Sequence, residues 1–384
     1  MNEEQPEKIW LSSPHMGGAE QQFVNEAFET NWIAPLGPNV NGFEKDLEGY
    51  LGNTHHIASL SSGTAAIHLA LVMAGVKAGD EVICQSFTFC GSANPILYLG
   101  ATPIFVDSEE DSWNICPNAL ETAIKDRISK GKRPKAIIAV HLYGMPYKSD
   151  AVNAFAKAYD IKVIEDSAEA LGSSYHGRKC GTLGDYGILS FNGNKIITTS
   201  GGGALVCNSS KEKEKAVFLA TQARDEAPHY QHSQLGYNYR LSNVAAGIGR
   251  GQMEVLDKHV ALRQSMHDFY KRIFENITGA RVQRTYKNEI VSNFWLSAIL
   301  IDENQTNGIN RETVRKELNK AAIESRPLWK PMHMQPLFDA YPYYGSNVCE
   351  KLFKNGLCLP SGSNLTDRDR ERIKKQIYGI FETE

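Results

Sequence analysis

The sequence lacks an excess of basic residues, a long apolar run and an apolar leader. Its 384 residues carry 41 Lys and Arg against 44 Asp and Glu, a net charge of −3, which argues against bulk electrostatic binding of nucleic acid. No stretch approaches the roughly 18 apolar residues that span a bilayer. The first ten residues, MNEEQPEKIW, lack the basic and apolar regions of a signal peptide. We therefore expect a cytoplasmic protein that binds neither nucleic acid nor membrane.

Paired cysteines are also missing. The seven cysteines are an odd number, and no two of them stand in a C-x-x-C pair. That distribution suits reduced, buried thiols better than a disulfide framework or a zinc site. We expect no metal.

The apolar residues that are present follow an alternating order. Between about residues 56 and 208, short runs such as EVICQS and KVIEDS are separated by segments with helical periodicity. This alternation predicts an α/β domain of buried parallel strands with helical crossovers. Two further strand candidates, YGILSF and GALVC, follow one another too closely for a helical crossover. We therefore expect a mixed sheet.

The chain divides into three predicted parts. Residues 1–40 are rich in turn residues and are expected to form an arm or lid. Residues 41–245 form the predicted large α/β domain, and residues 246–384 a smaller α+β domain. Within these parts the pattern predicts helices near 18–30, 241–274 and 310–322, and an extended stretch at 291–302.

Small residues follow the first predicted strand, at the edge where ligands collect in open α/β sheets. Ser61-Ser62-Gly63-Thr64 stands between that strand and a helix. Small residues let backbone N–H groups approach an anion, and a helix N-terminus favours phosphate. The same stretch could be a plain helix cap, so alone it leaves both interpretations open.

Two carboxylates, Glu165 and Asp166, end the apolar run KVIED. Burying both without a partner is costly. A metal ion is one conceivable partner, but no His or Cys is suitably spaced to complete such a site. A protonated ring nitrogen of a cofactor is the other.

Lys195 follows an Asn-Gly-Asn turn and precedes the glycines 201–203. A desolvated lysine is a nucleophile for carbonyls, whereas a surface lysine beside a turn is the plainer interpretation. The stretch Gln85–Phe89 could offer an aromatic face to a flat ring. The alternative is that its aromatic residues belong to the core. Together, a phosphate nest, a strand-end Asp, an aromatic and a lysine are the parts that pyridoxal 5′-phosphate requires.

Longer stretches, such as SSGTAAIHLAL, VIEDSAEALGSSYHGRKCGTLGDYGILSFNGNKIITTSGGGALV and GYNYRLSNVAAGIG, resemble the DegT/DnrJ/EryC1 family of sugar aminotransferases. The likeness runs from about Gly17 to LTDRDRERI. It implies a fold-type I pyridoxal-phosphate enzyme, with a large, mostly parallel sheet domain and a smaller α+β domain, that aminates nucleotide-linked keto-sugars. WIAPLGPNVNGFE and SRPLWKPMHMQPLF resemble the 4-aminotransferases that act on UDP-linked 4-keto-6-deoxy-N-acetyl sugars, of the bacillosamine-pathway kind.

The resemblance implies a catalytic core of three residues. Lys195 matches the Schiff-base lysine, Asp166 the partner of the pyridinium nitrogen, and Phe89 the aromatic stacked on the cofactor ring. The implied reaction is ping-pong, with glutamate as the amino donor and pyridoxamine phosphate as the carrier. Lys195 would then act as the general acid and base.

The resemblance also implies how the cofactor phosphate is held. The backbone of Gly63 and Thr64 and the hydroxyl of Ser190 match its ligands. Asn238 matches an asparagine that reaches the phosphate in the neighbouring subunit. This implies a homodimer whose active sites are shared.

Glu169 departs from the family pattern, because many members have Gln or His at this position. Its side chain is expected near the phenolic oxygen of the cofactor. An ionised Glu169 would repel a phenolate, so we expect it to be protonated or turned away, as a tuning of activity.

Other residues have two interpretations each. Arg326, Lys330 and His333 could bind the diphosphate of a sugar nucleotide, or could be loop residues that stabilise a dimer. His141 and Tyr143 could line the pocket, although a satisfied strand-end histidine is the plainer interpretation.

Two further functions remain as alternatives. A related dehydratase would use the same cofactor to remove a hydroxyl, but such members replace the lysine with His or add cysteine-ligated iron–sulfur clusters. A non-enzymatic regulatory relative would be expected to lack the lysine or the aspartate. The presence of Lys195 and Asp166 and the scattered cysteines count against both.

Overall fold

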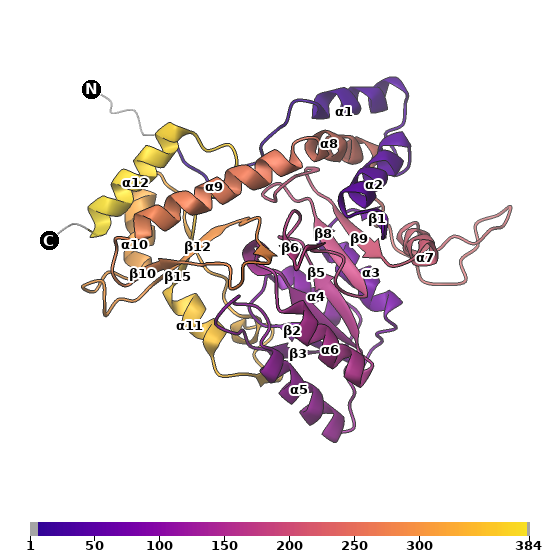
Figure 1. The fold of residues 1–384 in the computed structure, drawn as a ribbon. Helices are drawn as coiled ribbons and strands as arrows, with labels where there is room; N and C mark the ends of the chain where they lie inside the picture. The colour runs from indigo at the N-terminus through magenta and orange to yellow at the C-terminus, as the bar shows by residue number, and fades with distance from the viewer. Residues whose placement is uncertain (1–6, 382–384) are drawn as a thin grey trace.

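A computed structural model describes residues 7–381, so the first six residues of the predicted arm lie outside the described residues. The largest sheet contains β1 (His56–Leu60), β2 (Glu81–Gln85), β3 (Thr102–Val106), β4 (Ala136–Val140), β5 (Lys162–Asp166), β8 (Tyr186–Ser190), β9 (Gly203–Cys207) and β14 (Tyr343–Tyr344). Its order is β1-β9-β8-β5-β4-β2-β3-β14. Among these strands β9 alone runs opposite to the others, which confirms the predicted mixed, mostly parallel sheet (Figure 1).

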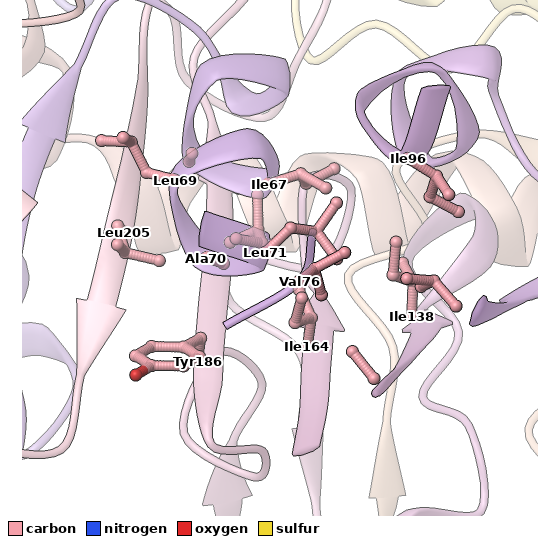
Figure 2. Close-up of a cluster of buried hydrophobic side chains, with 14 of the residues drawn as sticks. Ile67, Leu69, Ala70, Leu71, Val76, Ile96, Ile138, Ile164, Tyr186 and Leu205 are labelled. Carbon is pink, nitrogen blue, oxygen red and sulfur yellow. The ribbon is translucent and has the colours of Figure 1, made fainter. Parts of the chain in front are cut away.

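Helices between these strands cover the sheet. They are α3 (Gly63–Met73), α4 (Cys90–Tyr98), α5 (Pro117–Ser129), α6 (Ser149–Tyr159) and α7 (Ser210–Ala220). The sequence of α3, GTAAIHLALVM, has no charged residue, and most of its side chains are buried. Ile67 and Leu71 of this helix belong to the same cluster as Ile164 of β5 and Leu205 of β9 (Figure 2). Burial on all sides fixes α3, and hence its N-terminus, against the sheet.

The C-terminal part contains a second, antiparallel sheet in the order β10-β12-β15-β13. The strands of this sheet are β10 (Ala280–Val282), β12 (Ser297–Ile301), β13 (Arg326–Pro327) and β15 (Gly356–Leu359). The same part of the chain contains the helices α9 (Leu256–Phe274), α10 (Arg311–Lys320), α11 (Val348–Asn355) and α12 (Asp367–Phe381), with the short helix η2 (Met332–Met334). The α+β character matches the expectation for this region. The domain boundaries at residues 40 and 245 remain a prediction, since β14 of the C-terminal part pairs with β3 of the large sheet.

The helical pattern at 241–274 is two helices rather than one. The helix α8 (Asn243–Met253) ends two residues before α9, and Val255 between them is not helical. The physical reason is that the two segments bury different faces. The helix α8 packs on α1 (Glu20–Glu29) and α2 (Pro38–Tyr50), whereas α9 lies over the small sheet (Figure 1).

The run GIGRG within α8 makes this packing close. A Cβ added to Gly251 would lie 2.5 Å from the backbone nitrogen of Glu20, and one on Gly249 would lie 2.8 Å from the ring of Phe43. Small residues are therefore required where α8 meets α1 and α2.

A third, three-stranded sheet joins distant segments in the order β11-β6-β7. It contains β6 (Ser174–Tyr175), β7 (Arg178–Lys179) and β11 (Ile290–Val291), and the short helix η1 (Leu142–Gly144) follows β4. Within residues 7–381, no helix combines the length and apolar character needed to cross a bilayer.

Candidate active site

One cavity of about 540 Å³ opens at the carboxyl ends of β5 and β8. It brings together eight residues singled out in the sequence: Gly63, Thr64, Phe89, Asp166, Glu169, Ser190, Lys195 and Arg326. Asn238, Lys330 and His333 are not among the residues that line it. The strand-end residues therefore converge on one site, as parallel strands dictate.

The N-terminus of α3 forms one end of the cavity. Ser62 caps the helix by accepting a hydrogen bond from the N–H of Ala65 at 3.0 Å. A Cβ added to Gly63 would lie 3.5 Å from Ser190 Oγ. The hydroxyl of Ser190 thus lies beside the first N–H groups of a helix, which is an arrangement that suits a phosphate.

Gly203 explains why glycines follow Lys195 in the sequence. A Cβ at this position would lie 2.3 Å from the carbonyl carbon of Ser62 and 2.4 Å from the backbone nitrogen of Gly63. The start of β9 therefore touches the backbone at the N-terminus of α3. This contact fixes the anion-binding end of the cavity.

Asp166 is buried at the end of β5. Ser92 Oγ donates a hydrogen bond to Asp166 Oδ2 at 2.7 Å, and the N–H of Ala168 donates to Oδ1 at 3.1 Å. Burial raises the pKa of the Asp166 carboxyl above its ordinary value, against the hydrogen bond from Ser92. Its partners among the described residues are a hydroxyl and an amide, so a protonated ring nitrogen would supply the missing positive charge.

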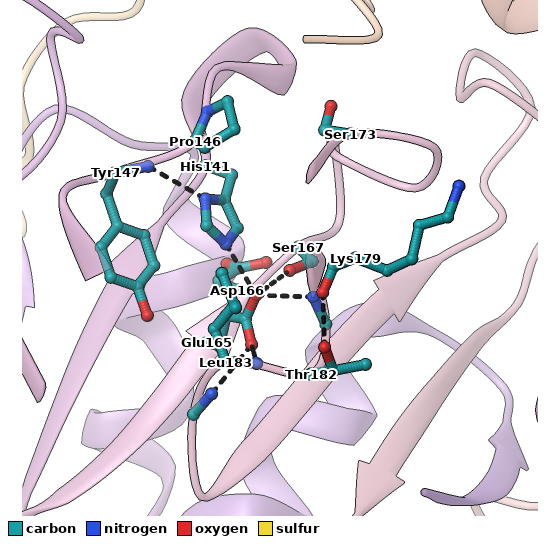
Figure 3. A network of polar contacts seen from close by, with 12 residues as sticks. His141, Pro146, Tyr147, Glu165, Asp166, Ser167, Ser173, Lys179, Thr182 and Leu183 are labelled. Atoms are coloured by element: carbon teal, nitrogen blue, oxygen red, sulfur yellow. Dashed lines mark hydrogen bonds and ion pairs between the residues drawn. The ribbon is translucent and has the colours of Figure 1, made fainter. Parts of the chain in front are cut away.

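Glu165 belongs to a separate buried network (Figure 3). His141 Nε2 lies 2.8 Å from Glu165 Oε1, and His141 Nδ1 accepts the N–H of Tyr147 at 3.1 Å. Glu165 also accepts N–H groups from the loop at 181–184. Although burial alone would raise the pKa of Glu165, the hydrogen bond from His141 holds it below its ordinary value.

Cys180 lies close enough to His141 and Glu165 for the three to be considered as metal ligands. Both nitrogens of His141 are already engaged, and burial raises the pKa of the Cys180 thiol. His141 and Glu165 are therefore satisfied by hydrogen bonds that support β5, and Cys180 is a buried thiol beside them. His141 has the role of a satisfied strand-end histidine.

Lys195 lies in a turn five residues beyond the end of β8 rather than at the strand end itself. The turn is closed by a hydrogen bond from its N–H to the carbonyl of Asn192 at 3.0 Å. Its Nζ lies 3.5 Å from Glu169 Oε1 and 4.0 Å from the centre of the Trp295 ring. The amine is thus held between a carboxylate and an aromatic face inside the cavity.

Glu169 is fixed by Tyr143, whose N–H donates to Glu169 Oε2 at 2.6 Å. Tyr143 has φ 54° and ψ 18°, a left-handed conformation that is costly for a bulky residue. Burial raises the pKa of Glu169 to about 7, against the lowering effect of Lys195. The carboxyl group can therefore gain or lose a proton near neutral pH.

Aromatic side chains form one wall of the site. Phe89 is 56% exposed, and its ring centre lies 5.4 Å from that of Trp329. The ring centre of Trp329 in turn lies 6.2 Å from that of Trp295. Tyr143 does not line the cavity, but its hydroxyl accepts the N–H of Trp329 at 3.0 Å and so supports this wall.

The predicted substrate residues lie differently. Arg326 is exposed at the cavity and donates to Glu324 at 2.8 Å. His333 contacts Ser86 at 2.7 Å and Glu350 at 3.2 Å, so both of its ring nitrogens are engaged. Lys330 lies between these two residues in the chain. The substrate roles of all three remain predictions.

Sequence reasoning missed Ser92, Trp295 and Trp329. Ser92 contacts Asp166 from the first turn of α4, just after the Gln85–Phe89 stretch. Trp295 and Trp329 come from the C-terminal part. The only local signal for the two tryptophans was the rarity of this residue type, of which the chain has five.

Comparison with known proteins identifies the family of this chain. The model of the DegT/DnrJ/EryC1/StrS aminotransferase family matches residues 14–378. EpsN of Bacillus subtilis, whose name assigns it to the pyridoxal phosphate-dependent aminotransferases, is 51% identical, covering 98% of this chain and 96% of EpsN. GDP-perosamine synthase of Caulobacter vibrioides is 36% identical, covering 95% of this chain and 96% of the synthase.

A solved structure has the same fold. The pyridoxal-phosphate form of Spr1654 from Streptococcus pneumoniae, named as a sugar aminotransferase, superposes with a TM-score of 0.88 at 25% identity. The match covers 98% of this chain and 99% of that one. This chain therefore belongs to the DegT/DnrJ/EryC1/StrS family of pyridoxal-phosphate-dependent sugar aminotransferases.

Proposed function

We propose that this enzyme transfers an amino group from glutamate to a UDP-linked 4-keto-6-deoxy-N-acetyl sugar. The observation that carries the proposal is the convergence of Lys195, Asp166 and the N-terminus of α3 on one cavity. The stretches WIAPLGPNVNGFE and SRPLWKPMHMQPLF support the sugar class by their resemblance to 4-aminotransferases of this kind.

The residues present fit pyridoxal phosphate. The N-terminus of α3 and the hydroxyl of Ser190 would hold its phosphate, and the buried Asp166 would face its ring nitrogen. Phe89 would cover the ring. When bound, the cofactor supplies a carbonyl carbon that condenses with amines and a ring that withdraws electrons.

Each polar side chain has a distinct task in this reaction. Lys195 would bind the cofactor through Nζ, and the same nitrogen would accept and return the proton that is moved during amino transfer. Asp166, oriented by Ser92, would place a negative charge at the ring nitrogen. Glu169, 3.5 Å from Lys195, holds or releases a proton beside that amine.

The shape of the cavity supports a sugar substrate. Trp295 and Trp329 both line it, and aromatic side chains suit the apolar face and deoxy methyl group of such a ring. Arg326 lies at the same cavity. Its guanidinium would bind the diphosphate of the nucleotide, with Lys330 and His333 as neighbouring candidates.

The proposed enzyme is a homodimer in which each site needs two chains. Asn238 is exposed and bridges to Thr221 in this chain, outside the cavity that contains Lys195. The segment between α7 and α8, which contains Asn238, extends as a long loop beyond α7 (Figure 1). In the dimer the partner subunit's Asn238 would complete the phosphate site.

Mixed dimers test the shared site directly. Lys195→Ala and Asn238→Ala subunits would each be weakly active alone. Random mixing would restore about a quarter of wild-type activity, because half of the dimers are mixed and one of their two sites is intact. No restoration after demonstrated subunit exchange would overturn the shared site while leaving the chemistry in place.

A substrate panel tests the sugar. UDP-, GDP- and dTDP-linked 4-keto and 3-keto sugars would be compared by kcat/KM, with the product identified by mass spectrometry. We expect the UDP-linked 4-keto-6-deoxy-N-acetyl sugar to be the best substrate. A higher kcat/KM for a GDP-linked sugar, the chemistry in the name of the Caulobacter relative, would overturn the nucleotide. Loss of a hydroxyl without amination would support the dehydratase alternative.

Arg326 gives a sharper test of diphosphate binding. Arg326→Ala is expected to raise KM for the nucleotide sugar on the order of tenfold and to leave the glutamate half-reaction unchanged. Lys320→Ala, which removes another exposed, ion-paired cation, is the matched control. Equal KM values for both variants and the wild type would contradict the role.

A further inference from the structure

Arg263 is a buried cation that the reaction described so far does not use. Its side chain projects from α9 and is only 1% exposed. Burial alone lowers the pKa of Arg263 to about 9, which leaves the guanidinium charged at neutral pH. No carboxylate within residues 7–381 forms an ion pair with it.

The guanidinium instead bonds to neutral oxygens from four segments. Its Nη1 donates to the carbonyl of Trp295 at 2.6 Å and to that of Ser361 at 3.3 Å. Its Nη2 donates to Ser12 Oγ at 3.0 Å and to the carbonyl of Lys195 at 3.4 Å. These segments lie far apart in the sequence, so Arg263 is their common contact.

The turn that contains Lys195 is also held from two other sides. Ser12 Oγ donates to the carbonyl of Asn194 at 2.7 Å, and Trp295 Nε1 donates to the same oxygen at 2.7 Å. Arg263 thus holds the peptide that follows Lys195, and two of the residues that Arg263 contacts, Ser12 and Trp295, hold the peptide that precedes it. The Trp295 ring that covers Lys195 Nζ belongs to the same assembly.

This arrangement is poorly explained as a device for stability. A buried charge without a counter-ion is expensive, and apolar replacements of buried charges are often neutral or stabilising. Moreover, Arg263 Nε has no hydrogen-bond partner in the described chain. A planar group with several donors is nevertheless what is needed to reach several oxygens at once.

We propose that Arg263 is a positioning residue for amino transfer. It fixes the backbone of Lys195 and the backbone of Trp295 relative to one another, so that the Lys195 amine reaches the cofactor and returns to the same place in each half-reaction. Arg263 contacts no reacting atom, and its effect is exerted through Lys195 and Trp295. The kinetic part of the test rests on the aminotransferase function, and the spectroscopic part does not.

The experiment uses the holoenzyme and the variants Arg263→Met and Arg263→Lys. The measured quantity is the visible circular dichroism of the bound cofactor divided by the absorbance of the same band. This ratio reports how rigidly and in which geometry the cofactor is held. It does not depend on the fraction of protein that is folded, because both signals come from bound cofactor. The dissociation constant for pyridoxal phosphate, kcat and KM are measured alongside.

Arg127→Met is the matched control. Arg127 is also a largely buried arginine, bonded to Glu81 at the amino end of β2, on the edge of the sheet away from the cavity. This variant loses a buried contact and stability without touching the Lys195 turn. It separates a loss of folded protein from a loss of positioning.

We expect both Arg263 variants to change the dichroism-to-absorbance ratio and to lower kcat on the order of tenfold or more, with KM changed less than kcat. Lysine keeps the charge but cannot span the four oxygens, so it should not restore the ratio. Should Arg263→Met fail to fold, Arg263→Lys and the milder Ser12→Ala decide the matter. A ratio and a kcat per folded molecule equal to those of the wild type, or the same change in Arg127→Met, would overturn the proposal.

Discussion

Glu169 Oε1 lies 3.5 Å from Lys195 Nζ in a pocket where the carboxylate is almost fully buried. The distance is longer than that of an ordinary N–H···O hydrogen bond, so the two groups are neighbours without forming a tight ion pair. The lysine lowers the pKa of Glu169, but burial outweighs it and places that pKa at about 7. The acid at this position is therefore a titrating neighbour of the catalytic amine.

Lys195→Ala should abolish the visible absorbance that pyridoxal phosphate acquires on binding, because the side chain that binds it covalently is lost. Transamination should fall on the order of a thousandfold or more. Lys162→Ala, an exposed lysine at the opposite end of β5 that pairs with Asp185, should retain the absorbance band and its bleaching by glutamate. An unchanged band in Lys195→Ala would contradict the assignment.

Glu169→Gln should change how the stability of the cofactor-free protein depends on pH. The pKa of Glu169 rises on folding from its ordinary value of 4.5 to about 7, so between these values the folded state binds more protons than the unfolded state. Its contribution to stability is therefore present below pH 4.5 and is lost as the pH rises to 7, with a slope of at most about 1.4 kcal/mol per pH unit.

Thermal unfolding measured from pH 4.5 to 8 checks this prediction. The Tm of Glu169→Gln relative to the wild type should increase with pH up to about 7 and then level off, since glutamine carries no titrating proton. A Tm difference that stays constant across this range would show that Glu169 does not titrate there.

Ser92→Ala should remove the side-chain hydrogen bond that orients the Asp166 carboxylate. A hydrogen bond to a charged group contributes about 1.5–3 kcal/mol, so we expect the dissociation constant for pyridoxal phosphate to rise about tenfold or more. Ser149→Ala is the control, because that buried hydroxyl has no hydrogen-bond partner in residues 7–381. Similar cofactor affinity in the two variants would argue that Ser92 does not orient Asp166.

Gly203→Ala should disturb the phosphate end of the cavity. The added Cβ would meet the backbone of Ser62 and Gly63, which cannot move like a flexible side chain. We expect a loss of about 1–3 kcal/mol in the free energy of unfolding and weaker binding of pyridoxal phosphate. Gly201→Ala has no atom within 4 Å of its new Cβ, and its stability should be close to that of the wild type.

The sequence predicts those features that depend on neighbouring residues. Strand ends, the cap at Ser62 and the order Asp166 then Lys195 are local patterns, and the parallel sheet brings them together. Ser92 meets Asp166 across 74 residues and Arg263 meets Lys195 across 68. No local periodicity encodes such contacts. The break between α8 and α9 was missed for a related reason, since both segments are helical and only their packing partners differ.

The two-residue strand β14 has a consequence for the solubility of the protein. It is the last strand beside β3, and Asp107 accepts the N–H of Ser346 in the loop after it and those of Val348 and Cys349 at the start of α11. A short edge strand offers little backbone for another chain to join. A chain cut before Tyr343 would leave the buried, β-branched strand Thr102–Val106 as an open edge. The C-terminal part therefore also protects the catalytic sheet from edge-to-edge aggregation.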